Sequence, residues 1–405
     1  MALEVDILGM EDFVREIQKR VKGVPISSGR GNKFGKISFD DLVFLPAQLA
    51  KRPVDYYREK ISSKTIVGKN SKKPIEIETP IIFGAMSFGA LSKEAKIALA
   101  KASTLAGTIE NTGEGGMLPE EREFAKHLIV QYSTGRFGIT EEILKKADAI
   151  EIKIGQGAKP GSGGLLPAEK VTEEITKLRN VPLDKDIHSP AYHLDIKNIS
   201  DLRKKVEWLR KISGGVPIII KLAAGDIEND VKLAVKANPD IIAIDGKGGG
   251  TGAAPEVILD EIGIPTLAAL VKAKEILDKI GARQELWIGG GLNNGGDFAK
   301  VLALGADAVF CATSLLIAMG CTYCRFCYLG KCPAGITTQD PELRKKLNIE
   351  EASQKVASFI KNCTEEVKMI AGSCGENNIH KLNKGHLRAL NSEIAKIAKI
   401  KLVGE

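Results

Sequence analysis

The chain has 405 residues and a formal net charge of +7; 43% of its residues are hydrophobic and 27% are charged. This composition is ordinary for a globular protein, and no basic stripe interleaved with aromatic residues indicates nucleic-acid binding. The N-terminus lacks the apolar core of a signal peptide, and no run of about 18 apolar residues occurs, so we expect neither secretion nor a membrane span.

From residue 80 onward, short apolar runs alternate with helical patterns. The eight candidate strands are PIIFGAM (80–86), AGTIEN (106–111), HLIVQY (127–132), AIEIKIG (149–155), PIIIKLA (217–223), DIIAID (240–245), ELWIGG (285–290) and DAVFCAT (307–313). Most are continuously apolar, as expected of parallel strands covered on both faces. Helical patterns lie between many of them, at 91–106, 140–147, 227–237 and 266–280. The alternation predicts an α/β fold, a (β/α)8 TIM barrel, with a doubly wound sheet as the alternative.

Three further segments surround or interrupt the predicted barrel of residues 80–313. Residues 1–79 are expected to pack outside the barrel as an N-terminal extension. Residues 156–215 are too long for a simple loop and predict an insertion after strand four, at the mouth of the barrel. Residues 314–405 are predicted to carry a cysteine loop followed by helices.

Active sites of such barrels lie at the carboxyl ends of the strands, and here those ends are rich in glycine. The glycine-rich stretches are IDGKGGGTGAAP (244–255) and GGGLNNGG (289–296), followed by CATS (311–314). Glycine lets backbone amides approach a phosphate closely, so we expect a phosphate group here; tight turns without a ligand are the alternative.

Polar residues also occur where apolar ones are expected. Lys221 interrupts the run IIIKLA, and Lys153 interrupts EIKIG one strand earlier. A lysine in a buried strand needs a partner or a chemical role: Lys221 suits the negative charge of a reduced flavin, whereas an ion pair with Glu151 or Asp245 is the structural alternative. Further polar residues at strand ends, suited to a small dicarboxylate or a flavin edge, are Asn111, Thr112, Glu114, Gln131, Gln156 and Lys159.

Four cysteines within twelve residues form the densest motif. Cys321, Cys324, Cys327 and Cys332 have the spacing C-x2-C-x2-C-x4-C and end in Cys-Pro. Zinc ligands are usually split into two separated pairs, whereas a single tight run is typical of an iron–sulfur site. We therefore expect one iron–sulfur cluster, with zinc, a disulfide or idle thiols as alternatives. The other cysteines show no disulfide spacing, which favours the cytoplasm, and no histidine has metal-ligand spacing.

Together these motifs resemble one family, the FMN-binding synthase region of glutamate synthase large subunits. The resemblance runs from about Phe39 to Leu390 and includes FDDLVFLPAQL (39–49), GAMSFGALSKEA (84–95), NTGEGG (111–116), EIKIGQGAKPGSGGLLP (151–167) and KCPAGITTQDPELR (331–344). It implies an FMN-containing barrel beside an iron–sulfur cluster. It also implies that 2-oxoglutarate and ammonia are converted through 2-iminoglutarate to glutamate.

The resemblance also implies roles for individual residues. FMN would contact Ala85, Met86, Ser87, Gln131, Lys221, Gly249, Gly250, Gly290, Gly291, Ala312 and Thr313. Substrate would meet Asn111, Gln156 and Lys159, while Lys153, Lys221 and Glu114 would be catalytic. The family holds a 3Fe–4S cluster on three cysteines, which match Cys321, Cys327 and Cys332. The additional Cys324 favours a 4Fe–4S cluster, with a 3Fe–4S cluster and an idle Cys324 as the alternative.

The chain also departs from the family pattern. Ser162 replaces a usual acidic residue, SPAYHLDI (189–196) replaces a two-histidine stretch, and Met117–Leu118 replaces a GED continuation. No amidotransferase domain and no nicotinamide-binding fingerprint is present. We therefore expect a separate glutaminase subunit or free ammonia, and a ferredoxin or an NAD(P)H-oxidising subunit; the oligomeric state stays open. The alternatives are an FMN oxidoreductase acting on another 2-oxo acid or an N-substituted amino acid, and a non-catalytic electron-transfer subunit.

Overall fold

The computed structural model of the chain describes residues 7–27, 29 and 37–405, and its centre is an eight-stranded parallel barrel. The strands are β5 (Ile81–Phe83), β6 (Glu110–Asn111), β7 (Leu128–Tyr132), β8 (Ala149–Lys153), β11 (Ile218–Ala223), β12 (Ile241–Asp245), β14 (Glu285–Gly289) and β15 (Ala308–Cys311). From β6 to β15 each strand pairs with the next of these strands in the chain, and β15 pairs with β5. The amide of Phe83 donates to Ile109 O at 3.1 Å, which brings β5 against β6 and nearly closes the barrel. All eight predicted strands and the predicted fold are confirmed.

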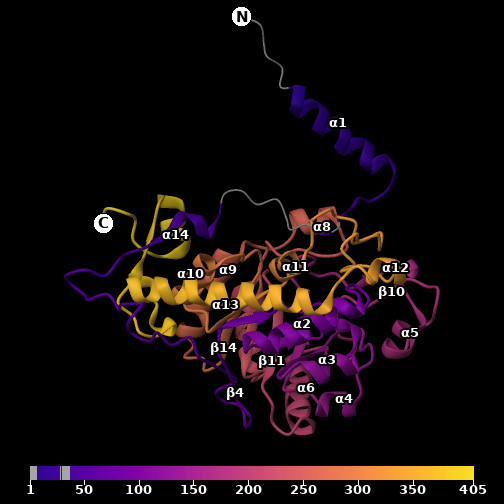
Figure 1. Cartoon of the computed structure of the whole chain (residues 1–405), viewed down its shortest axis with the longest axis horizontal. Helices are drawn as coiled ribbons and strands as arrows, with labels where there is room; N and C mark the ends of the chain where they lie inside the picture. Colours follow the sequence, from indigo (N-terminus) through magenta and orange to yellow (C-terminus); the bar gives the residue numbers. More distant parts are fainter. Residues whose placement is uncertain (1–6, 28, 30–36) are drawn as a thin grey trace, which may run out of the picture.

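An outer ring of helices covers the barrel (Figure 1). These helices are α2 (Lys93–Ala106), α3 (Pro119–Phe124), α4 (Glu141–Lys145), α6 (Ile199–Ile212), α7 (Ile227–Lys236), α9 (Thr266–Lys279), α10 (Gly295–Ala303) and α11 (Thr313–Met319). Local sequence sets their ends: in α2, the Ser92 side chain caps the first turn and Gly107, at φ 68°, ends the last one. The long helix α13 (Ile349–Ser373) lies across α2, α10 and α11.

The insertion after β8 is shorter than predicted. It contains the two-stranded β9 (Leu165–Leu166) and β10 (Ile187–His188), the 3-10 turn η3 (Ala168–Lys170) and α5 (Glu173–Arg179). Helix α6 lies within the predicted 156–215 but packs against α4 and α7 as a member of the outer ring. The excursion at the mouth therefore ends before Ile199, because every parallel strand needs a helical return to the start of the next.

The flanking segments form short antiparallel pairs with the barrel region, with each other and within the N-terminal segment. They are β1 (Ile26–Ser27) with β13 (Ala254–Pro255), β2 (Leu42–Phe44) with β16 (Leu387–Ala389), and β3 (Thr65–Val67) with β4 (Ile75–Ile77). The remaining helices are α1 (Ile7–Val21), α8 (Glu256–Glu261), α12 (Pro341–Arg344) and α14 (Ser392–Ala398). Of the predicted N-terminal extension, residues 1–6, 28 and 30–36 lie outside the described residues.

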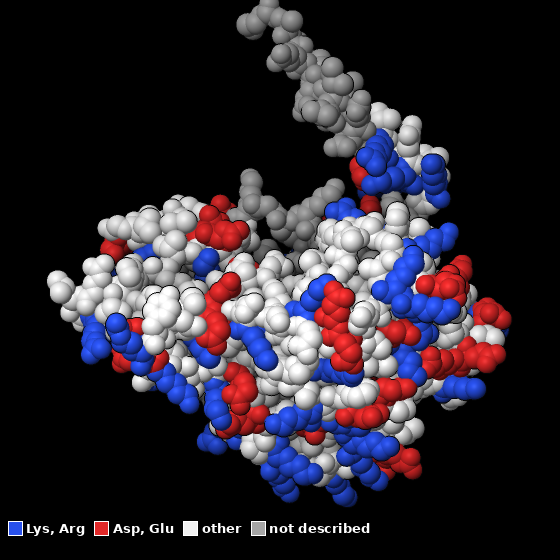
Figure 2. Space-filling view, in the orientation of Figure 1, with Lys and Arg blue, Asp and Glu red and all other residues white. Residues whose placement is uncertain are grey.

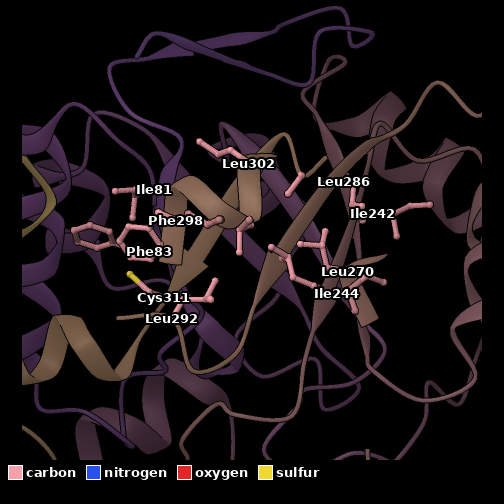
Figure 3. Close-up of a cluster of buried hydrophobic side chains, with 14 of the residues drawn as sticks. Ile81, Phe83, Ile242, Ile244, Leu270, Leu286, Leu292, Phe298, Leu302 and Cys311 are labelled. Carbon is pink, nitrogen blue, oxygen red and sulfur yellow. The ribbon is translucent and has the colours of Figure 1, made fainter. Parts of the chain in front are cut away.

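Alternating side chains along the strands divide the core into two parts. Outward-facing residues pack against the helices; Figure 3 shows Ile81, Phe83 and Cys311 beside Phe298 and Leu302 of α10. Inward-facing residues fill the lower barrel, where the β3–β4 hairpin adds its own apolar side chains: Val67, Ile75, Ile77, Ile82, Ile109, Ile129, Ala149, Ile219, Ile241, Ala243, Trp287 and Ala308. Side chains therefore fill the lower barrel, so a ligand must bind at the end where the strands have their carboxyl termini.

No helix in the described part of the chain is both long and apolar enough to cross a bilayer. Basic and acidic side chains are interspersed over the face seen in Figure 2. This mixed face is consistent with a sequence in which no basic stripe indicates nucleic-acid binding.

Candidate active site

A cavity of about 1140 Å³ opens at the carboxyl ends of the barrel strands. Its wall combines strand ends, the insertion, the glycine-rich turns and the cysteine loop. Most of the predicted site residues line it: Ala85, Met86, Ser87, Glu114, Gln131, Lys153, Gln156, Lys159, Lys221, Gly249, Gly250, Gly290, Gly291, Ala312, Thr313, Cys321, Cys324, Cys327 and Cys332. The structure thus brings residues from eight strand ends and a distant loop to one place; their roles remain predictions.

In β7, β8 and β11, the side chains that point into the barrel are apolar in its lower part and polar at the floor of this cavity. Lys221 Nζ lies 2.8 Å from Glu151 Oε1, and Gln131 Nε2 donates to the same oxygen at 2.6 Å. Lys221 thus has the carboxylate partner that the structural alternative required, while still lining the cavity. One side of this floor carries a neutralised charge pair and not a free cation.

Asn111, predicted to bind substrate, lies outside the lining of the cavity. Its side chain is buried, donates to Glu151 Oε2 at 3.1 Å and accepts from the amide of Gly113 at 3.0 Å. The side chain of Asn111 is not among the described residues that line the cavity. The Asn111 side chain thus supports Glu151, and its role in substrate binding stays a prediction.

A second group of charged residues, next to the Lys221–Glu151 pair because Lys153 is the register partner of Lys221, carries an excess of positive charge. Lys153 Nζ lies 3.0 Å from Glu114 Oε2. Burial raises the pKa of Glu114, but Lys153 and Lys159 outweigh it and lower the pKa to about 2. The ammonium of Lys159 makes no direct hydrogen bond or ion pair with any described residue, and burial lowers its pKa to about 8. Lys159 therefore presents a cation without a direct partner to the cavity.

Lys153 is held in place through its backbone. His193 Nε2 lies 2.8 Å from Lys153 O, and Arg136 Nη1 lies 2.7 Å from His193 Nδ1. Burial and the nearby Arg136 lower the pKa of His193 to about 4, so the ring is neutral and donates its Nε2 hydrogen to Lys153. Arg136 also pairs with Asp195 at 2.6 Å and stacks on Tyr132. The loop after β10 is thereby fastened to the end of β8.

Two buried cations in the insertion also line the cavity and were not predicted from sequence. Arg179, at the end of α5, donates to Phe88 O; burial lowers its pKa to about 10 although Glu114 acts in the opposite direction. Lys170, in η3, is buried and reaches backbone oxygens on two loops. Both lie in KVTEEITKLRNVP (170–182), a stretch that resembles the family and is predicted to contain a helix, but nothing in its local pattern marks either cation as a site residue.

The glycine-rich turns approach one another so closely that side chains are excluded. A Cβ atom at Gly290 would lie 2.4 Å from Gly246 O, and Gly290 and Gly291 have φ angles of 116° and 75°. Only glycine adopts these angles readily. The turns after β12 and β14 thus expose backbone rather than side chains to the cavity, as a phosphate site requires.

The four cysteines border the same cavity from its outer side. Burial raises the pKa of Cys332, but the backbone N–H groups of Thr337, Ile336 and Ala334 outweigh it and lower the pKa. The amide of Tyr323 donates to Cys321 Sγ at 3.4 Å. Within the described residues, no three or more His, Cys, Asp or Glu side chains converge closely enough to hold a metal ion. The loop thus brings four thiols to the edge of the cavity but does not converge them into a metal-binding set.

Comparisons with known proteins agree with this arrangement. Residues 36–377 match the family model described as the conserved region in glutamate synthase. The glutamate synthase large subunit-like protein of Rhizobium meliloti is 40% identical over 396 residues, covering 93% of this chain and 90% of that protein. The archaeal glutamate synthase [NADPH] of Methanocaldococcus jannaschii is 40% identical over 420 residues, covering 95% and 82%.

Solved structures support the fold independently. A flavocytochrome b2 variant with sulfite bound superposes with a TM-score of 0.58 at 16% sequence identity, covering 91% of this chain and 79% of that one. At that identity the likeness concerns the barrel alone. The resemblance seen in the sequence motifs is nevertheless confirmed by the family model and by the curated relatives, and the chain belongs to the glutamate synthase family.

Proposed function

We propose that this protein is an FMN-dependent oxidoreductase that carries out the synthase reaction of glutamate synthase. Ammonia adds to 2-oxoglutarate, water leaves, and the resulting 2-iminoglutarate takes up a hydride and a proton to give L-glutamate. The observation that carries the proposal is the joint placement of Glu114, Lys153, Lys159 and Arg179 beside the glycine-rich turns in one cavity of a chain from this family.

The residues on the strand-end side of the cavity fit FMN. Residues Ala85–Ser87 and the close turns at Gly290 and Gly291 line the cavity, and the two glycines add no side chain at the position expected for a phosphate. Ala312 and Thr313 complete the predicted phosphate side, and Gln131 and Lys221 lie on the cavity floor. When bound, FMN would supply the hydride that reduces the imine carbon.

The charged residues on the insertion side fit a dicarboxylate. Lys159 and Arg179 are cations that line the cavity, and each would favour one carboxylate group of 2-oxoglutarate. Glu114 stays ionised at neutral pH because its pKa is about 2, so it can accept hydrogen bonds from the attacking ammonia. Lys153, anchored by His193 and paired with Glu114, is placed to stabilise negative charge that develops on the keto oxygen.

The cysteine loop fits a cluster by the chemistry of its donors. Four thiols lie in one loop beside the cavity, and backbone N–H groups favour the thiolate of Cys332. We propose that all four, including Cys324, hold a 4Fe–4S cluster that passes electrons to FMN. The electrons would come from a ferredoxin or an NAD(P)H-oxidising subunit, and nitrogen from free ammonia or a glutaminase subunit. The free thiols of Cys311, Cys363 and Cys374 support a reducing, cytoplasmic location.

The test is turnover by the anaerobically purified chain. We expect bound FMN, and glutamate formed from 2-oxoglutarate and ammonium with reduced viologen as the electron donor. Iron content and EPR spectra before and after dithionite decide the cluster: a signal only after reduction indicates 4Fe–4S, whereas a signal in the oxidised protein indicates 3Fe–4S. A protein without FMN, or one without turnover, contradicts the proposal; a clear preference for another 2-oxo acid supports the alternative oxidoreductase.

A further inference from the structure

Lys170 occupies an unusual position between the two predicted cofactor sites. It ends the 3-10 turn η3, and only 5% of its surface is exposed. Its ammonium lies 3.2 Å from Ala90 O, 3.3 Å from Cys327 O and 3.3 Å from Thr337 O. Three neutral carbonyl oxygens satisfy its hydrogens, but no carboxylate of the described residues pairs with it. A buried cation without a counter-charge is costly unless an anion is supplied.

The carbonyl groups that Lys170 contacts belong to two different loops. Ala90 lies in the turn after β5 that carries Ala85–Ser87, and the amide of Leu91 closes this turn on Ser87 O at 2.9 Å. Cys327 is one of the four cysteines, and Thr337 follows Cys332 by five residues in the same loop. The stem of Lys170 passes Gly330, where an added Cβ would lie 3.3 Å from Lys170 Cγ. Lys170 thus bridges the predicted flavin turn and the cysteine loop.

A second side chain makes a parallel bridge without charge. Gln339 Nε2 donates to Gly89 O at 3.2 Å and to Leu91 O at 2.7 Å, in the same turn. The backbone adds a third link, since the amide of Ser92 donates to Ile336 O at 2.8 Å. The two loops are therefore held together by several neutral contacts, and among these contacts, all within the described residues, Lys170 alone adds a charge. This difference separates the electrostatic role of Lys170 from its mechanical one.

We propose that Lys170 is a positioning residue for electron transfer, a fixed positive charge that faces the cluster and holds the cysteine loop against the flavin turn. The inference rests on the proposed function, because it requires both cofactors. Four thiolates and their irons would supply the anion that the buried ammonium lacks. A reduced cluster carries one more negative charge than an oxidised one, so the nearby cation favours the reduced state and raises its potential.

The experiment compares three variants of the full chain with their cofactors. K170M removes the charge and the bridge, K170R keeps the charge, and Q339L removes a neutral bridge. An EPR-monitored redox titration should give a more negative cluster potential for K170M, a value near wild type for K170R and an unchanged value for Q339L. Reduction of FMN by the pre-reduced cluster, followed by its absorbance, should be at least tenfold slower in K170M.

A second readout needs no cofactor. In the full chain stripped of iron, K170M should allow faster alkylation of Cys327, identified by peptide mass spectrometry, while alkylation of the distant Cys363 should not change. If K170M does not retain its cluster, this alkylation measurement tests whether Lys170 holds the cysteine loop in place. A K170M protein with wild-type potential, wild-type FMN reduction and wild-type alkylation overturns the proposal. If wild-type protein itself lacks a cluster or FMN, the proposed function fails first, before any variant is compared.

Discussion

Two glutamates four residues apart, Glu110 and Glu114, have opposite electrostatic surroundings. Both lie beside a lysine, but Glu110 is fully buried on the outer face of β6, where Lys96 of α2 lies 3.0 Å from Glu110 and also 3.0 Å from Glu121 of α3. Burial, with Glu121 nearby, raises the pKa of Glu110 to about 8, whereas two lysines lower that of Glu114 to about 2. Buried charge therefore does not identify a catalytic group by itself.

What separates the two clusters is access and charge balance. The closed cluster of Lys96, Glu110 and Glu121 is almost fully buried, and one cation faces two carboxylates, so it retains a proton at neutral pH. The open cluster of Glu114, Lys153 and Lys159 lines the cavity and has more cations than anions. The first arrangement fastens helices to the barrel, and the second can bind an anion.

The largest expected effect comes from a substitution that disrupts the closed cluster. Lys96→Met leaves two buried carboxylates without a cation and should lower the free energy of unfolding by about 3–5 kcal/mol. Urea denaturation measures the loss, and the kcat of the protein that remains folded should be unchanged. The control, K96M/E110L/E121L, removes all three charges and should recover most of the stability. A K96M variant with normal stability and low kcat would contradict the division between the two clusters.

Disrupting the open cluster should have the reverse effect: activity should fall and stability should change little. Lys153→Met removes the cation placed at the keto oxygen and should lower kcat by about 10²–10³-fold. Steady-state assays with reduced viologen measure this, and thermal unfolding should show little change. His193→Phe, which loses the hydrogen bond to Lys153 O, should give a smaller fall in the same direction. A loss of stability in K153M as large as that in K96M would show that the open cluster is structural too.

The raised pKa of Glu110 predicts a dependence of stability on pH. Because its folded pKa of about 8 exceeds its ordinary value of 4.5, its contribution is fully present below pH 4.5 and is lost as pH rises through 8. The slope from this one group is at most about 1.4 kcal/mol per pH unit. Urea midpoints between pH 5 and 9 should show a weaker slope in Glu110→Gln than in the wild type. An identical slope in both proteins would rule out Glu110 as its source.

The smallest expected effect concerns Lys159. Its pKa of about 8 means that it loses its charge as pH rises through 8, so the KM for 2-oxoglutarate should increase there by about tenfold. Lys159→Arg keeps the charge and should remove this increase, while kcat should follow the wild-type profile. A KM that rises equally in both proteins would point to a different titrating group.

The sequence alone determined the barrel and the identity of most cavity residues. Continuous apolar runs such as IIIKLA predict buried parallel strands, and the exact alternation of side chains puts Glu151, Lys153 and Lys221 inside the barrel once those strands are placed. The four closely spaced cysteines predicted a cluster site for the same reason, because their spacing is a local feature of the sequence. Such features depend on neighbours a few residues away, which a sequence displays directly.

Only the tertiary structure decided which charges meet. Lys221 pairs with Glu151 rather than Asp245, Asn111 supports Glu151 below the cavity, and Arg179 and Lys170 reach the cavity from the insertion. Glu110 and Glu114 are four residues apart, yet Glu110 faces helices and Glu114 faces the cavity. These outcomes depend on closure of the barrel and on the path of a loop across its mouth, which bring together residues that no local pattern connects.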